Sequence, residues 1–203
     1  MEVPSVFYPI DRLEACLRTK VSTSRNYLWV GRLDANKDPI TLIKAFVKFL
    51  IANPEVHLYV IFQSDELIED VEMLVAASSA EKQITLVGKV EHDELLHWYN
   101  SVDFIVSTSH YEGSGIAVCE GMSCGAIPIL TNIPSFRMMT GHGNCGLLFD
   151  AGNVDGLVIA LQKSLTMNVE AERAKTLFQY DKCLSAEAIA TRMIQVARQV
   201  TVS

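Results

Sequence analysis

The sequence predicts one α/β domain in which helices cover both faces of a doubly wound, mainly parallel, six-stranded, Rossmann-like sheet. Short runs rich in β-branched and aromatic residues recur along the chain, and they are almost uniformly apolar, as in strands that are buried on both faces. A helical pattern follows each run. The chain has 203 residues, 49% of them apolar, which suits one domain with a single core.

Six segments with these properties are expected to be the strands: 27–31, 57–62, 84–88, 104–107, 127–131 and 146–149. The helices expected between them span 39–51, 66–77, 93–100, 115–124 and 135–139. The first of these helices has its large apolar side chains on one face and Lys44 and Lys48 on the other, and Pro39 suits its first position.

The two ends of the chain differ from this alternating middle. Residues 1–24 show no clear period, and we expect a leader or a strap between domains there. Helical patterns follow Asp150, over 154–165, 171–178 and 185–200. The chain therefore divides into the strap, a Rossmann-like domain over 25–182 and a C-terminal helix over 183–203.

Composition excludes several classes of protein. The net charge of −7 argues against a nucleic-acid-binding surface. No apolar run approaches the roughly 20 residues of a membrane span, and the first residues lack the pattern of a secretory signal. The cysteines are odd in number and form no C-x-x-C pair, as expected for reduced thiols in a cytoplasmic protein; they are Cys16, Cys119, Cys124, Cys145 and Cys183.

Two strand-end loops hold the residues best suited to bind a ligand, because ligands of such sheets bind beyond the carboxyl ends of the strands. The first loop follows Gly31 and places Arg32 and Lys37 close together in sequence. An arginine fork and a lysine point charge suit a diphosphate. A solvated surface turn explains the same residues equally well.

The second loop leads from a strand into a helix through Gly113, Ser114 and Gly115. Glycine lets the backbone approach a ligand, and the free N–H groups of residues 114–117 would face an anion at the helix N-terminus. Glu112 and Glu120 flank this turn, and a carboxylate can accept from two vicinal hydroxyls. These residues suit a phosphorylated, hydroxylated ligand, or else a glycine turn with two solvated carboxylates.

Other patterns give weaker signals. His142 could act as a general base but fits a surface histidine better. His92 and His97 are five residues apart, which is the wrong helical spacing for a shared metal ion, so solvated or capping roles are expected. Cys119 and Cys124 fit packing thiols better than nucleophiles. No metal site is expected, since the one acidic cluster fits the wet face of a helix; it comprises Glu66, Glu69, Asp70 and Glu72.

Four motifs keep their order and spacing over residues 27–165, and together they resemble the C-terminal, donor-binding domain of retaining glycosyltransferases with the GT-B fold, family GT4. They are Val30-Gly31-Arg32-Leu33-Asp34-x-x-Lys37, Tyr111-Glu112-Gly113-x-Gly115-x-x-x-x-Glu120-x-Met122-x-Cys124-Gly125-x-x-Pro128, Gly146-Leu147-Leu148-Phe149 and Asp155-Gly156-Leu157-x-x-Ala160.

The resemblance implies roles for several of the matching residues. Arg32 and Lys37 would bind the donor diphosphate and stabilise the departing nucleotide without a metal ion, and Glu112 would contact the donor sugar; these three are the expected catalytic residues. Glu120 would hold the ribose hydroxyls. The donor site implied in this way comprises Gly31, Arg32, Lys37, Gly88, Val90, Glu112, Gly113, Ser114, Gly115, Ile116, Ala117 and Glu120.

Three departures from the family pattern affect the shape of this site. Ser114 stands where the family usually has Phe, residues 62–65 replace a glycine-rich turn, and Asp38-Pro39 replaces a Gly after Lys37. None of them removes a charged donor ligand.

Only residues 1–26 precede the first expected strand, so the chain would be one half of a GT-B enzyme. The N-terminal domain that holds the acceptor would belong either to the same full-length chain or to a separate subunit. The last helix would pack on that domain or cap its own sheet. The chain alone is expected to bind a UDP- or GDP-sugar and transfer little. A peripheral position at the inner face of the membrane, through the missing domain, stays open. The alternatives are a non-catalytic nucleotide-sugar-binding or regulatory subunit of a split transferase, and a sugar-nucleotide epimerase domain with the GT-B fold.

Overall fold

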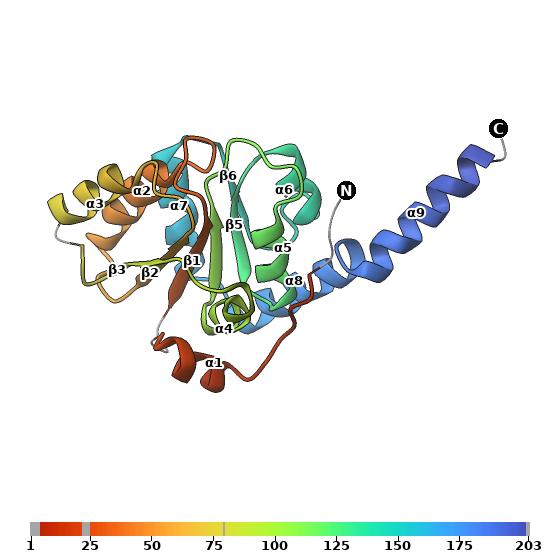
Figure 1. Cartoon of the computed structure of the whole chain (residues 1–203), viewed down its shortest axis with the longest axis horizontal. Helices are drawn as coiled ribbons and strands as arrows, with labels where there is room; N and C mark the ends of the chain where they lie inside the picture. Colours follow the sequence, from red (N-terminus) through yellow and green to blue (C-terminus); the bar gives the residue numbers. More distant parts are fainter. Residues whose placement is uncertain (1–4, 22–24, 79, 202–203) are drawn as a thin grey trace.

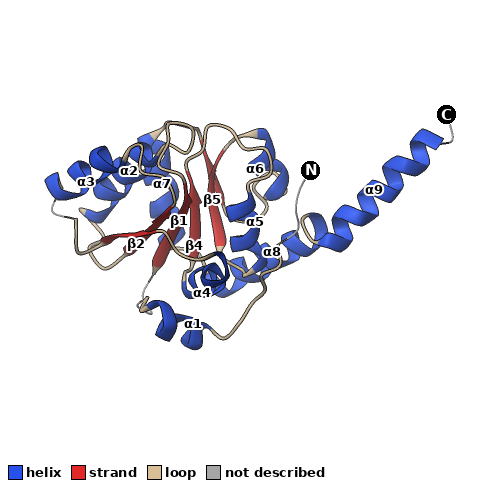
Figure 2. Cartoon of the chain, viewed as in Figure 1, coloured by secondary structure: helices blue, strands red, loops and turns tan. Residues whose placement is uncertain are grey.

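The structure, a computed structural model, describes residues 5–21, 25–78 and 80–201. Six parallel strands form one sheet in the order β3-β2-β1-β4-β5-β6, which confirms the predicted Rossmann-like fold. Figure 2 shows strands of this sheet in red, with blue helices around them. The strands are β1 (Asn26–Gly31), β2 (His57–Phe62), β3 (Ile84–Gly88), β4 (Phe104–Ser107), β5 (Ile127–Thr131) and β6 (Leu147–Phe149). The chain runs outward from β1 to β3 and then returns to β4 beside β1. The strand order therefore reverses between β1 and β4.

Helices cover both faces of this sheet (Figure 1). The first face packs against α2 (Pro39–Leu50), α3 (Ile68–Ala77) and α7 (Val154–Leu165). The second packs against α4 (Leu95–Ser101), which follows the 3₁₀ turn η1 (His92–Glu94), and against α5 (Ile116–Ser123), α6 (Pro134–Met139) and α8 (Val169–Cys183). All predicted strands and helices are present, and α8 extends beyond its predicted range at both ends.

Aromatic side chains fill the centre of the first face. The ring of Tyr27 stacks on Phe104 at 5.0 Å between centroids and meets Phe46 and Phe49 edge-on at 5.4 and 5.9 Å. The Tyr27 hydroxyl lies 2.7 Å from Ser164 Oγ on α7, and burial raises its pKa to about 12. This phenol remains protonated and hydrogen-bonded, so its burial leaves no unpaired polar group in the core.

The N-terminal region contains a helix that the sequence did not predict, α1 (Arg12–Thr19). The Asp11 carboxylate caps it by accepting from Glu14 N at 2.9 Å. The helix packs on α4, where Thr19 Oγ1 lies 2.8 Å from Ser101 Oγ, and Arg12 pairs with the buried carboxylate of Asp103. It was missed because it is short and buries only Ala15 and Cys16.

The C-terminal helix, α9 (Ala186–Thr201), continues from α8 and projects away from the sheet (Figure 1). Met193, Ile194 and Val196 on this helix expose more than half of their surface. Across residues 5–21, 25–78 and 80–201, we find no helix with both the length and the apolar character required to cross a bilayer.

The cysteines give a test of how the core is packed. All five are described and none forms a disulfide; four are buried, and Cys183 is half-buried. Burial raises the pKa of Cys124 to about 12 and that of Cys145 to about 11. Because the thiolate is the reactive form, we expect an aromatic disulfide reagent at pH 8 to modify Cys183 rapidly and the other four only after denaturation. Cys183→Ser should remove the rapid phase. Rapid modification of Cys124 or Cys145 in the native chain would show that this core is open.

Candidate functional site

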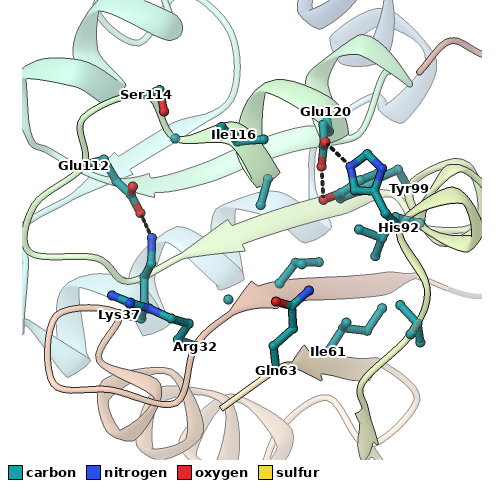
Figure 3. Close-up of a pocket in the computed structure, with 16 residues that line it drawn as sticks. Arg32, Lys37, Ile61, Gln63, His92, Tyr99, Glu112, Ser114, Ile116 and Glu120 are labelled. Atoms are coloured by element: carbon teal, nitrogen blue, oxygen red, sulfur yellow. Dashed lines mark hydrogen bonds and ion pairs between the residues drawn. The ribbon is translucent and has the colours of Figure 1, made fainter. Parts of the chain in front are cut away.

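The candidate site is a cavity of about 390 Å³ at the carboxyl ends of the central strands, a size typical of ligand pockets. It lies beside the point where the strand order reverses, between the β1–α2 and β4–α5 loops. Figure 3 shows its two ends, with Arg32, Lys37 and Glu112 at one and Glu120, His92 and Tyr99 at the other.

The two loops that meet at this point are held to each other by hydrogen bonds. Asn36 Nδ2 donates to Tyr111 O at 3.0 Å, and Tyr111 N donates back to Asn36 Oδ1 at 3.1 Å. The Thr108 hydroxyl donates to Lys37 O at 2.7 Å, and Lys37 N donates to Asp34 Oδ1 at 2.9 Å. These bonds fix the loop backbone that carries Lys37 and Glu112, so their side chains start from defined positions.

Lys37 and Glu112 form an ion pair across the cavity (Figure 3). Lys37 Nζ and Ser109 Oγ both donate to Glu112 Oε1, the latter at 2.8 Å, and the Lys37 side chain is only 22% exposed. Arg32 Nη2 lies 2.8 Å from Asp34 Oδ2 with 63% of its side chain exposed. The lysine is therefore enclosed between the two loops, whereas the arginine is mostly exposed and paired with Asp34.

The N-terminus of α5 supplies backbone donors between the two ends of the cavity. Its first internal bond runs from Cys119 N to Gly115 O at 2.9 Å. The N–H groups of Ile116 and Ala117, two residues that line the cavity, therefore have no helical carbonyl to bind. Together with the helix dipole, they favour an anion at this point.

Gly115 starts α5 in the left-handed region, with φ +56°. A Cβ on Gly115 would also lie 3.0 Å from Phe136 Cε1 and 3.3 Å from Met139 Sδ. We expect Gly115→Ala to lower the free energy of unfolding by about 1–3 kcal/mol in urea titrations. Gly113→Ala is the matched control, because its Cβ would meet nothing within 4 Å; equal effects of the two variants would contradict this account.

Glu120 occupies the other end of the cavity, on α5, and both of its oxygens accept a hydrogen bond. Tyr99 OH donates to Oε2 at 3.0 Å, and His92 Nε2 lies 2.8 Å from Oε1. The Glu120 side chain is 7% exposed but lines the cavity. Burial, and then the charge of Glu120, raise the pKa of Tyr99 well above its ordinary value, so this phenol is a permanent donor. The carboxylate is thus fixed in orientation with lone pairs to spare for a ligand.

The structure brings most of the predicted site residues to this one cavity. They are Gly31, Arg32, Lys37, Val90, Glu112, Ser114, Gly115, Ile116, Ala117 and Glu120. Gly88 and Gly113 are not among the lining residues, although Gly88 has the positive φ of +82° that its place at the end of β3 requires. His142 is exposed and also lies outside the lining.

Six lining residues lie outside the predicted set of site residues: Val30, Ile61, Gln63, His92, Leu95 and Tyr99. Gln63 belongs to the turn over 62–65, which was expected to affect the shape of the site, and Ile61 lies at the carboxyl end of β2, where the strand-end rule could have found it. The pairing of His92 with Glu120 had no sequence signal, because it joins residues on two separate elements. Within the described residues, no three His, Cys, Asp or Glu side chains form a group that could hold a metal ion.

Comparison with curated proteins finds relatives that are much longer than this chain. A GDP-mannose:cellobiosyl-diphosphopolyprenol alpha-mannosyltransferase of Xanthomonas campestris is 26% identical over 154 residues, which cover 75% of this chain and 40% of that protein. A D-inositol 3-phosphate glycosyltransferase of Arthrobacter sp. (strain FB24) is 27% identical over 150 residues, covering 72% of this chain and 36% of that protein. The chain therefore spans about 40% or less of these two relatives.

Solved structures share the fold. The C-terminal domain of the glycosyl transferase group 1 family protein LpcC from Francisella tularensis superimposes with a TM-score of 0.78 at 21% identity, over 89% of this chain and 97% of that one. Anabaena Alr3699/HepE, solved in complex with UDP and glucose, gives a TM-score of 0.82 at 14% identity, over 100% of this chain and 56% of that one. These likenesses confirm one half of a GT-B fold.

A sequence model of the family described as "Glycosyl transferases group 1" matches residues 18–180, which is most of the chain. The match includes both strand-end loops and every lining residue of the cavity. The chain therefore belongs to the glycosyl transferases group 1 family.

Proposed function

We propose that this chain is the donor-binding domain of a retaining glycosyltransferase that moves a hexose from a nucleoside diphosphate to a hydroxyl acceptor. One observation carries the proposal: a single cavity gathers a lysine–carboxylate pair, the open N-terminus of α5 and the buried, doubly hydrogen-bonded carboxylate of Glu120. These groups match a donor sugar, a diphosphate and a ribose in the order in which a nucleotide sugar presents them.

The diphosphate would lie between the β1–α2 loop and the start of α5. Lys37, the exposed Arg32 and the free N–H groups of Ile116 and Ala117 supply positive charge there. As the bond to the sugar breaks, negative charge grows on the departing diphosphate, and donors already fixed in place stabilise it at little cost of reorganisation. Lys37 would exchange part of its contact with Glu112 for the phosphate, which leaves that carboxylate to accept from the sugar hydroxyls.

The nucleoside would occupy the opposite end. Glu120 accepts the two ribose hydroxyls, while Val90, Leu95 and Ile61 provide an apolar surface for the base. Gln63 places an amide at the rim of this region, where a base edge could bond to it (Figure 3). A named relative uses GDP-mannose and one similar structure contains UDP, so both bases belong in the test.

A second, N-terminal domain would bind the acceptor and close over the donor. The relatives' greater length and the projecting, partly apolar α9 support this proposal, because a lone helix of this length is only marginally stable in water. In this arrangement residues 1–24 form the connection between the domains, and residues 183–203 pack on the acceptor domain. We propose a cytoplasmic enzyme, held at the inner face of the membrane through that domain, and little transfer by this chain alone.

The intact pair of Lys37 and Glu112 favours an enzyme over a non-catalytic binding subunit, since a module that only bound nucleotide would have no need of a sugar-facing carboxylate. A transfer assay of this chain together with its N-terminal domain distinguishes the enzyme from the binding subunit. An enzyme should transfer the sugar to an acceptor, and its Glu112→Gln version should not.

The proposal is tested by thermal unfolding of the chain with UDP, GDP, ADP and their sugar conjugates, each with and without EDTA. A ligand at about 100 times its dissociation constant adds about 2.7 kcal/mol to the free energy of unfolding, which raises the melting temperature measurably. We expect one nucleotide class to give such a shift, unchanged by EDTA. If no nucleotide shifts the transition, this cavity is not a donor site.

A further inference from the structure

A segment outside the family match lies against the Glu120 end of the cavity. The match begins at residue 18, and residues 5–10, here called the N-terminal strap, precede α1. Hydrogen bonds hold this strap to the domain: Ser123 Oγ donates to Ser5 Oγ at 2.9 Å, and Ile10 N donates to Asn100 Oδ1 at 2.9 Å. The strap is therefore anchored at both ends, on α5 and on α4.

Between these anchors, Phe7 contacts both hydrogen-bond donors of Glu120. Its ring lies 5.0 Å from the His92 ring, at an interplanar angle of 32°, and 6.0 Å from the Tyr99 ring. His92 and Tyr99 bond to the two different oxygens of Glu120. One side chain of the strap thus contacts both side chains that donate to this carboxylate.

The two donors depend on Phe7 to different degrees. Tyr99 is fully buried in the domain core and stays in place without help. His92 follows β3 in an exposed turn, and its side chain is 64% exposed. An exposed imidazole has many rotamers to lose when it is fixed, and stacking on a neighbouring ring offsets that loss. The Phe7 ring is therefore a contact that can restrict the exposed His92 side chain to the position in which it meets Glu120.

We propose that Phe7 is a positioning residue for nucleotide binding, which acts by holding His92 on Glu120 and so couples the N-terminal strap to the donor site. The inference rests on the proposed function, in which Glu120 accepts the ribose hydroxyls. Each carboxylate oxygen can accept one protein donor and one hydroxyl. With His92 in place the carboxylate keeps one orientation, and the ribose meets a preorganised partner.

The test is a set of dissociation constants for UDP and GDP, and for their 2′-deoxy forms, measured by calorimetry on the 203-residue chain. We expect Phe7→Ala and His92→Ala each to weaken ribonucleotide binding about five-fold, with a smaller effect on the 2′-deoxy forms. The double variant should bind no more weakly than His92→Ala, because Phe7 acts through His92. Tyr8→Ala is the matched control, since it removes an exposed ring from the same strap.

Three results would overturn the inference. The first is that Phe7→Ala binds ribonucleotides as well as Tyr8→Ala does, while His92→Ala binds them more weakly. The second is that the losses in affinity from Phe7→Ala and His92→Ala add in the double variant, and the third is that ribose and 2′-deoxyribose forms lose equal affinity. Phe7→Leu keeps apolar contact without a stacking ring, so it answers the same question if Phe7→Ala does not fold. The proposed function fails separately, if Glu120→Ala leaves ribonucleotide binding unchanged.

Discussion

Replacing Lys37 with methionine is expected to weaken nucleoside diphosphate binding by about 10- to 100-fold and to leave binding of the free nucleoside nearly unchanged. A charged hydrogen bond to phosphate is lost, while methionine keeps the apolar stem of the side chain. The loss is increased because the Glu112 carboxylate, now paired with Lys37, would face the diphosphate uncompensated. Within the described residues, Lys37 is the one cation that forms an ion pair with Glu112.

The measurement is a pair of titrations, diphosphate against nucleoside, on each variant. Lys48→Met is the matched control: it removes the same charge from α2, where Lys48 Nζ pairs with Asp155 Oδ1 at 2.9 Å, outside the lining of the cavity. An effect confined to Lys37→Met and to phosphorylated ligands is the expected pattern. Equal losses for nucleoside and diphosphate would refute the phosphate role of Lys37.

Glu120→Ala is expected to weaken ribonucleoside diphosphate binding by about 10- to 100-fold and to reduce the preference for ribose over 2′-deoxyribose. Two hydroxyl contacts are lost, and the buried hydroxyl of Tyr99 loses the acceptor that it bonds at 3.0 Å. Leaving such a donor unpaired costs about 1–3 kcal/mol, so the melting temperature should fall as well.

Glu120→Gln separates these two effects, because the amide keeps an acceptor oxygen and the shape of the side chain. It should restore most of the stability and little of the ribose preference. Glu94→Gln, on the exposed turn η1 where Glu94 pairs with Arg18, is the charge-matched control. A ribose preference that survives in Glu120→Ala would place the ribose elsewhere in the cavity.

Much of the fold could be predicted from the sequence because burial on both faces leaves a direct signature. The strands β1 and β2 are apolar along nearly their whole length, which marks central parallel strands. The helix α1 was not predicted because it is short and buries only two small residues, Ala15 and Cys16. Its position depends on tertiary pairs such as Arg12 with Asp103, which no local pattern encodes.

The candidate site could also be predicted only in part. The sequence predicts that one site holds Arg32, Lys37, Glu112 and Glu120, because the ends of adjacent parallel strands meet at one edge of the sheet. The pairing of Lys37 with Glu112, and the arrangement of Phe7, His92 and Tyr99 around Glu120, could not be predicted. These contacts join separate elements, and their geometry is set by how the helices pack rather than by local spacing.

A crystal structure of the chain with the nucleoside diphosphate that stabilises it most would show directly whether this cavity is a donor site. We expect the diphosphate at the N-terminus of α5, within hydrogen-bond reach of Lys37, and the ribose hydroxyls on Glu120. A nucleotide bound outside this cavity, or bound in it with the ribose on Lys37 and the phosphates toward Glu120, would contradict this expectation.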